Sequence, residues 1–253
     1  TIITVVRNGK DCIQETMNSV FLQDYQNIEY IVIDGCSNDG TFDILKSNQY
    51  QIDILISEKD QGIYYAMNKG IELSSGDLVG FLNASDILYP NTISKLASAY
   101  EQDHFDYSFG SAHIESEQGI RIALSSPLKE IPIKSNSYTG MPSPHLAVYM
   151  KLSFLRSLGM FDTQFGLSSD YDLLLRAIKR SRHFWIFDEP VGAFRLGGVS
   201  GSYRTYFENF LVMRKNNIQW AMRMYITARG LAGLFLRNNF PHRFHSSIKR
   251  FFK

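Results

Sequence analysis

Four acidic residues stand where the sequence could assemble a reactive site. Asp34, Asp60 and Asp86 each follow a short apolar run, and Asp170 stands at the start of a helical pattern. A carboxylate can bind a hard cation, accept hydrogen bonds from a ribose or a base, or remove a proton from a hydroxyl group. Two simpler roles stay open, because Asp86 could cap a turn and Asp170 could be an acid favoured by a helix dipole.

Predicted strands and helices alternate through the first hundred residues, and these elements must position the acids. Apolar runs over 1–6, 29–33, 52–56 and 78–82 predict buried strands, and the apolar spacing over 11–23, 41–47 and 62–73 predicts helices. This alternation predicts an α/β fold with a mostly parallel central sheet flanked by helices. In such sheets ligands bind beyond the carboxyl ends of the strands, so the polar residues that follow the strands should converge on one crevice.

The pattern changes after about residue 104. Short strand candidates over 105–109, 120–124, 147–150 and 184–187 mix with turn-rich stretches, and a helix is predicted over 170–179. Asp172 lies on this helix too, but two positions from Asp170 it points to a different side.

Three stretches together resemble the family 2 glycosyltransferases with the Rossmann-like GT-A fold. They are Ile31–Thr41, Ser57–Gly70 and Phe81–Asp86, and the residues over 168–173 and 197–200 fit the same pattern. The resemblance covers about residues 1–202. It implies a GT-A catalytic domain there, with a nucleotide-sugar-binding half over about 1–103 and an acceptor-binding half over about 104–202. The branch that it most resembles builds polysaccharides.

The resemblance also assigns roles to the acids. Asp170 matches the general base that lies beneath the acceptor hydroxyl. Asp86 matches a ligand of the Mg²⁺ or Mn²⁺ ion that stabilises a leaving diphosphate. The family usually has several acids at this point, whereas this chain has Asn83-Ala84-Ser85-Asp86, so the resemblance implies a weakly bound cation.

Other positions are implied to bind substrate. The nucleotide-sugar donor is expected at Asn8, Asp34, Asp60, Asn83 and Asp86. The acceptor or the diphosphate is expected near His145, Arg195, Gly197 and Gly198. Gly35 stands where many members have a second Asp, so the way the base is bound cannot be copied from the family.

The implied activity is an inverting transfer of a sugar, of hexosyl or deoxyhexosyl type, from a nucleotide-diphosphate donor to a hydroxyl of a glycan or lipid-linked acceptor. The alternative is a catalytically inactive member that binds sugar nucleotides or acts as a scaffold. A nicotinamide oxidoreductase and a P-loop NTPase are disfavoured, because neither Gly-x-Gly-x-x-Gly nor Gly-x-x-x-x-Gly-Lys-Ser/Thr is present.

Charge divides the chain into two parts. Residues 203–253 contain ten Lys/Arg and one acid, whereas residues 1–202 contain 16 Lys/Arg and 24 Asp/Glu. We interpret 203–253 as a basic, aromatic-rich helical tail that resembles amphipathic helices on an anionic membrane surface. Packing on the catalytic domain and a homodimer contact stay open, and nucleic acid is not expected, because no base-reading motif accompanies the basic residues.

The cellular location is expected to be cytoplasmic, peripheral on the cytoplasmic face of the membrane. The only two cysteines, Cys12 and Cys36, have no metal-ligand spacing and fit reduced thiols. No signal peptide is visible, although the chain starts at Thr1 without Met. No apolar run reaches the ~18–20 residues of a membrane-spanning helix.

Overall fold

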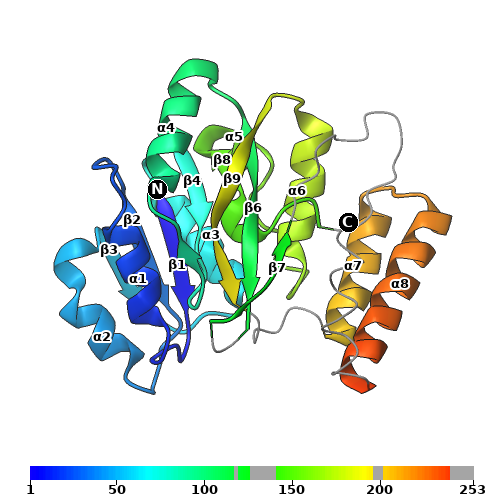
Figure 1. Ribbon diagram of the computed structural model, residues 1–253, viewed down its shortest axis with the longest axis horizontal. Helices are drawn as coiled ribbons and strands as arrows, with labels where there is room; N and C mark the ends of the chain where they lie inside the picture. Colours follow the sequence, from blue (N-terminus) through cyan, green and yellow to red (C-terminus); the bar gives the residue numbers. More distant parts are fainter. Residues whose placement is uncertain (117–118, 126–140, 196–201, 240–253) are drawn as a thin grey trace.

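A single twisted sheet organises the computed structural model, which describes residues 1–116, 119–125, 141–195 and 202–239 (Figure 1). Within these ranges the sheet has nine strands in the order β3-β2-β1-β4-β8-β6-β9-β5, with β7 paired to β6 outside this order. The strands are β1 (Ile2–Val6), β2 (Tyr30–Asp34), β3 (Ile54–Ser57), β4 (Leu78–Phe81), β5 (Ile87–Leu88), β6 (Tyr107–Glu115), β7 (Arg121–Ser125), β8 (Tyr149–Lys151) and β9 (Phe184–Arg195).

Most of the strands run in one direction. Strands β3, β2, β1 and β4 pair in parallel. Strand β8 is antiparallel to both β4 and β6, so β6 runs the same way as β4, and β9 is parallel to β6. Six of the nine described strands therefore share one direction, which confirms the predicted mostly parallel sheet.

Helices cover both faces of this sheet. They are α1 (Ile13–Phe21), α2 (Thr41–Ser47), α3 (Ile63–Leu73), α4 (Thr92–Asp103), α5 (Leu152–Ser157), α6 (Ser169–Arg180), α7 (Tyr203–Lys215) and α8 (Trp220–Asn239), with short 3₁₀ turns η1 (Gln49–Gln51) and η2 (His145–Ala147). Along β1, Ile3 and Val5 join the buried cluster of α3, α5 and α6, whereas Ile2 and Val6 join that of α1, α2 and α4. Alternate side chains of a strand point to opposite faces, so both faces are buried.

The elements predicted for the first hundred residues are confirmed, with ends that differ by at most two residues, whereas helix α4 and the short strand β5 were not predicted. Of the later strands, β6 and β9 are longer than predicted, and β9 continues to Arg195. Its pairing with β6 shifts register on both sides of the pair Ser111 and Pro190. Proline has no N–H group to give to a sheet, so a bulge at this point is expected.

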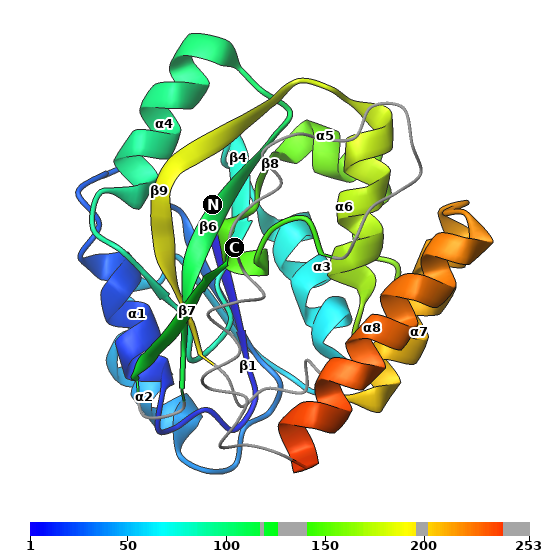
Figure 2. The same ribbon diagram turned by 45° about the vertical axis from the view of Figure 1, so that its right-hand side comes forward.

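Helices α7 and α8 lie side by side at the end of the molecule opposite α2 (Figures 1 and 2). Val212 and Met213 of α7 are buried in the same cluster as the α3–α6 face of the sheet. A Cβ atom on Gly230 of α8 would lie 2.2 Å from the ring of Tyr206 of α7, so the two helices touch directly. The domain boundary at residue 202 stays a prediction. None of the helices in the described ranges combines the length and the hydropathy needed to cross a bilayer.

Candidate functional site

The loops that follow β1 and β2 are joined by hydrogen bonds. The backbone N–H of Asn8 donates to Ser37 Oγ (2.8 Å), and Asn8 Oδ1 accepts from the backbone N–H of Asn38 (3.0 Å). Asp39 Oδ2 accepts from the backbone N–H of Lys10 (3.0 Å). Asn8 has a positive φ of 54°, which asparagine tolerates better than most residues. Asn8 is exposed, and its side chain holds the loop after β2 in place.

Asp34 ends β2 and is completely buried. Its carboxylate accepts from the backbone N–H of Ser37 (3.2 Å) and from the hydroxyls of Ser37 and Ser57 (2.5 Å for Ser57 Oγ). The side chain thus joins the ends of β2 and β3 and shapes the loop beside them. Its contact with a donor nucleotide stays a prediction.

Asp60 lies between β3 and α3 and is held by Lys69 of α3. Lys69 Nζ donates to Asp60 Oδ1 (2.7 Å) and also pairs with Glu58. The second oxygen, Asp60 Oδ2, is buried and has no hydrogen-bond partner. A buried acceptor without a donor is unfavourable, so this oxygen is available to a ligand hydroxyl or N–H group.

Asp86 closes the turn after β4 and is almost fully buried. One of its oxygens, Oδ1, accepts from the backbone N–H of Arg195 at the end of β9 (3.3 Å). Burial raises the pKa of the Asp86 carboxyl to about 7, while the hydrogen bond and charge of Arg195 act in the opposite direction. A carboxylate in this position gains from a cation, because its own contacts compensate the charge only in part.

The Arg195 side chain is directed to other acids. Its guanidinium donates two hydrogen bonds to Glu15 of α1 (2.5 and 2.7 Å), and Nε lies 3.7 Å from a Glu115 oxygen of β6. The backbone of Arg195 therefore contacts Asp86 while its charge is paired elsewhere. Gly197 and Gly198, predicted beside it, lie outside the described residues.

Two side chains with amide or carboxylate oxygen atoms, Asn83 and Asp86, lie in the turn after β4. Asn83 Oδ1 is buried without a hydrogen-bond partner, three positions before Asp86. Carboxylate and amide oxygens suit Mg²⁺ and Mn²⁺, which usually keep several ligands from water and phosphate. Within the described ranges no group of three or more His, Cys, Asp or Glu side chains could hold a metal ion. The residues present thus fit a cation that takes most of its ligands from a bound substrate.

Asp170 begins α6 and contacts α3. Its Oδ1 accepts from the phenol of Tyr64 (3.0 Å) and from the backbone N–H of Tyr171 (2.8 Å). Burial and the neighbouring Asp170 raise the pKa of the Tyr64 phenol, so Tyr64 stays protonated and donates. The carboxylate is half-buried and held in one orientation, as a general base must be.

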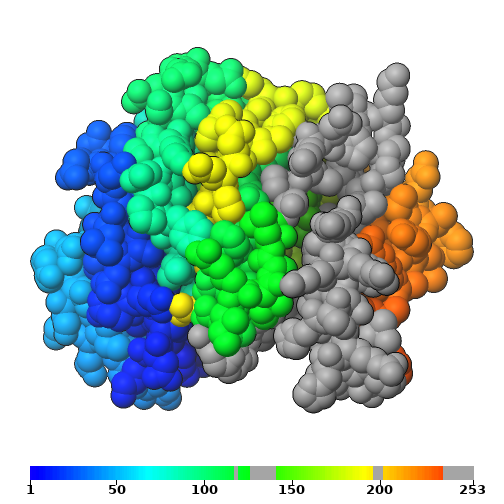
Figure 3. Space-filling view, in the orientation of Figure 1, coloured from blue at the N-terminus to red at the C-terminus, as the bar shows by residue number. Residues whose placement is uncertain are grey.

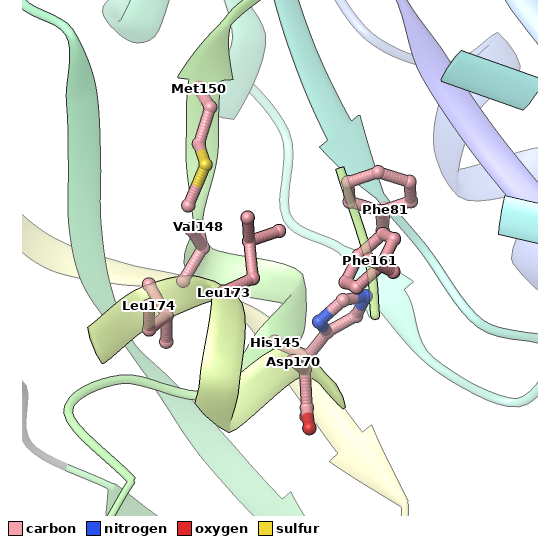
Figure 4. Close-up of a pocket in the computed structure, with 8 residues that line it drawn as sticks. All are labelled: Phe81, His145, Val148, Met150, Phe161, Asp170, Leu173 and Leu174. Atoms are coloured by element: carbon pink, nitrogen blue, oxygen red, sulfur yellow. The ribbon is translucent and has the colours of Figure 1, made fainter. Parts of the chain in front are cut away.

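Asp170 lies at the edge of a mostly apolar pocket (Figure 4). The pocket is lined by Phe81, His145, Val148, Met150, Phe161, Asp170, Leu173 and Leu174. Figure 4 shows the His145 ring beside Asp170, whose carboxylate points away from the rings of Phe81 and Phe161. Burial lowers the pKa of His145, and the charge of Asp170 opposes this. The imidazole is therefore neutral near pH 7, and its Nε2 is buried without a partner.

Phe81 connects the two acidic sites. It ends β4, just before the Asn83–Asp86 turn, and its ring packs against those of His145 (5.3 Å between centroids) and Phe161 (5.0 Å). The turn that bears Asp86 contacts α1 instead, because Thr16 Oγ1 donates to the Asp86 carbonyl (3.0 Å). Asp86 thus follows β4 beside α1, whereas Asp170 of α6 contacts α3 and lines the same pocket as Phe81.

Asp172 points away from the pocket, as its spacing from Asp170 predicts. It is fully buried and accepts from Arg176 Nε (2.7 Å), Lys215 Nζ (3.1 Å) and Asn216 Nδ2 (2.8 Å). Lys215 ends α7 and Asn216 follows it, so Asp172 joins α6 to the helical tail. Its carboxylate is occupied by structural contacts.

Sequence reasoning missed Tyr64, Asn68 and Phe161. Asn68 donates to the Phe161 carbonyl (2.9 Å) and accepts from its N–H (3.0 Å), which fixes the ring in the pocket. Tyr64 and Asn68 are one turn apart on α3, so they share a face. That spacing was visible within Ser57–Gly70, but it did not indicate which distant residues the face contacts.

Comparison with known proteins gives matches over most of the chain. The family model described as Glycosyl transferase family 2 matches residues 1–157. An uncharacterised glycosyltransferase of Mycobacterium tuberculosis is 30% identical over 185 residues, which is 70% of this chain and 68% of the relative. A glycosyltransferase of Bacillus subtilis, named for a proposed part in teichuronic acid biosynthesis, is 31% identical over 124 residues, 47% of this chain and 48% of the relative.

Solved structures share the fold at low identity. TarS 1–349 of S. aureus in complex with UDP-GlcNAc has a TM-score of 0.68 and 18% identity, over 94% of this chain and 73% of that one. The mannosyltransferase PcManGT of Pyrobaculum calidifontis, in complex with GDP-Man and Mn²⁺, has a TM-score of 0.62 and 14% identity, over 98% and 77%. These likenesses confirm the GT-A fold.

Proposed function

Because the chain belongs to glycosyl transferase family 2, we propose that it transfers a sugar from a nucleotide-diphosphate donor to a hydroxyl of a glycan or lipid-linked acceptor. We propose a hexosyl or deoxyhexosyl donor and a place in surface polysaccharide biosynthesis. The relative named for teichuronic acid biosynthesis supports the second point, since it matches about half of the chain. A peripheral position on the cytoplasmic face of the membrane suits a lipid-linked acceptor.

The observation that carries this proposal is the Asp170 carboxylate held by Tyr64 at the edge of the pocket. Asp170 takes the proton from the acceptor hydroxyl. The acceptor oxygen forms a bond with the anomeric carbon as the bond from that carbon to the diphosphate oxygen breaks, on the opposite face. The nucleoside diphosphate leaves, and the configuration of the sugar is inverted.

The acceptor hydroxyl has a second neighbour in the His145 imidazole. It is neutral near pH 7, so it can exchange a hydrogen bond with the acceptor without adding a charge beside the base. Its buried Nε2 would gain the partner that it lacks.

The donor is proposed to bind where the β1–β4 loops meet. Asp60 Oδ2 and the exposed Asn8 supply acceptors and donors for the nucleoside, and Asp34 shapes the loop around it. Asp86 and Asn83 would hold the Mg²⁺ or Mn²⁺ ion, which supplies charge to stabilise the leaving diphosphate. Arg195 would reach the diphosphate only by giving up its pairing with Glu15.

A donor panel tests the proposal. UDP-, GDP- and dTDP-linked sugars are offered one at a time with Mn²⁺ or Mg²⁺, and release of the nucleoside diphosphate is measured. We expect Asp170→Asn to lose at least a hundredfold in rate while nucleotide binding, read by thermal shift, is kept. Asp188→Asn, an exposed acid on β9, is the matched control and should leave the rate unchanged.

Three results would overturn parts of the proposal. Activity that persists in both Asp170→Asn and Asp86→Ala would refute the assignment of the two acids. A product that keeps the donor configuration, read by NMR of the anomeric proton, would refute the single displacement. Tight nucleotide binding without turnover of any donor would favour the inactive sugar-nucleotide-binding alternative, which the Asn83–Asp86 sequence keeps open.

A further inference from the structure

Helix α8 presents an apolar face outward. We define the outer face of α8 by six side chains, Trp220, Met224, Tyr225, Ala228, Ala232 and Phe235, which are exposed and recur every three or four residues. The Trp220 side chain is 65% exposed. A helix on the surface of a globular protein normally directs charged and polar residues to solvent. The outer face of α8 reverses this pattern.

The opposite side of α8 packs against the rest of the protein. Leu234 is buried, and Met222 and Ile226 pack against the main hydrophobic cluster. The contact of Gly230 with Tyr206 fixes the helix on α7. The rotation of α8 about its axis is thus determined by packing, so the outer face is held outward. In Figure 3 helices α7 and α8 form one end of the molecule.

Positive charge accompanies this apolar face. Arg229 is exposed beside it, and Arg214 of α7 is exposed on the neighbouring helix. From residue 220 to residue 253 the sequence contains seven Lys/Arg and no Asp or Glu. Residues 1–202, by contrast, contain more acidic than basic residues. Two copies of so basic a segment would repel each other, which disfavours a symmetric contact between two α8 helices.

We propose that the outer face of α8 rests on a bilayer surface that contains anionic lipids. Trp220 and Tyr225 suit the level of the headgroups, since each joins an apolar ring to a polar tip, and Met224 reaches toward the acyl chains. Arg229, which is exposed beside this face, lies near the lipid phosphates. This inference deepens the peripheral location proposed above, and it is independent of the transferase chemistry.

Vesicle binding without donor or acceptor tests the proposal, so its failure leaves the proposed reaction untouched. The full chain is sedimented with vesicles of phosphatidylcholine alone or with 30% phosphatidylglycerol. We expect at least tenfold tighter binding to the anionic vesicles, weakened when NaCl is raised from about 0.1 to 0.5 M. Met224→Ser with Tyr225→Ser should weaken binding at least tenfold. The matched control is Tyr50→Ser, which changes a tyrosine that is 81% exposed at the other end of the molecule and should bind like the wild type.

Tryptophan fluorescence gives a second readout. The chain has two tryptophans, and Trp185 is partly buried on the sheet, where it packs against Phe105 and Phe187, away from α8. Brominated lipids should therefore quench Trp220, and Trp220→Phe should abolish the quenching. Absence of binding to anionic vesicles, or equal loss in the Tyr50 control, would overturn the proposal. A concentration-dependent dimer in sedimentation velocity that the double variant dissociates would assign the face to a second copy instead.

Discussion

Replacement of Asp86 by Asn should stabilise the protein without ligand at alkaline pH. The buried carboxyl has a pKa of about 7 in the folded chain, against an ordinary value of 3.8. Because the folded pKa is raised, the folded state disfavours the charged form. The resulting loss of stability is absent below about pH 4, grows as the pH rises, and is complete above about pH 7. An amide has no charge to bury and removes this loss.

The structure sets the size of the effect. The difference between 3.8 and about 7 corresponds to about 4 kcal/mol at about 1.4 kcal/mol per pH unit. The new amide can still accept from the Arg195 N–H. Against the gain we set about 1–3 kcal/mol for an NH₂ group that replaces a carboxylate oxygen and finds no acceptor. The net gain at pH 8.5 is about 2 kcal/mol, or roughly 4–8 °C in the unfolding midpoint for a chain of this size.

Thermal unfolding of the wild type and Asp86→Asn is measured at pH 8.5 and pH 5. At pH 5 most of the stability that the charged Asp86 costs the wild type is regained. The variant should therefore unfold at a similar or a lower temperature than the wild type. Mn²⁺ with UDP or GDP should stabilise the wild type at pH 8.5 and leave the variant unchanged. Asp188→Asn makes the same replacement at an exposed acid. The difference between its unfolding midpoint and that of the wild type should be the same at both pH values. A variant that is less stable than the wild type at both pH values would refute the reasoning.

Three further changes probe the framework around the site. Asp172→Ala removes the buried acceptor that Arg176, Lys215 and Asn216 share and should cost about 3–5 kcal/mol in urea unfolding; a loss below about 1 kcal/mol would show that the contacts are dispensable. Gly80→Ala places a Cβ atom 2.3 Å from the Tyr149 ring, so a loss of about 1–3 kcal/mol is expected, and an unchanged urea midpoint would contradict it. Tyr64→Phe frees Asp170 and should lower kcat about tenfold with little change in KM or thermal midpoint, whereas an equal loss in Phe42→Ser, a distant exposed aromatic, would point to a nonspecific effect.

The first half of the fold could be predicted because its signals are local. Each strand of the β1–β4 set is a short apolar run that ends in a polar turn, and each connecting helix shows its buried face in the spacing of its own residues. Parallel strands place their carboxyl ends at one edge, so the meeting of the Asn8, Asp34 and Asp86 loops followed from topology alone.

The second half depends on contacts between distant residues. Strand β9 contains Pro190 and two acids, which argue against a strand, and it forms because β6 and β5 pair with it from both sides. Arg195 was expected near the diphosphate, yet its side-chain partner Glu15 is 180 positions away in the chain. Asp170 was found through resemblance to a family, while its contact with Tyr64 required the folded structure.

The two carboxylates of α6 restrict how this chain can vary. Asp170 is the proposed base and contacts Tyr64, whereas Asp172 contacts the tail, and only one residue separates them. A residue inserted between them would turn one carboxylate by about 100° relative to the other, since a helix has 3.6 residues per turn. Either the base or the anchor would then be lost. Insertions and deletions in related sequences should therefore accumulate in the loops before and after α6, while the register within its first turn is inherited unchanged.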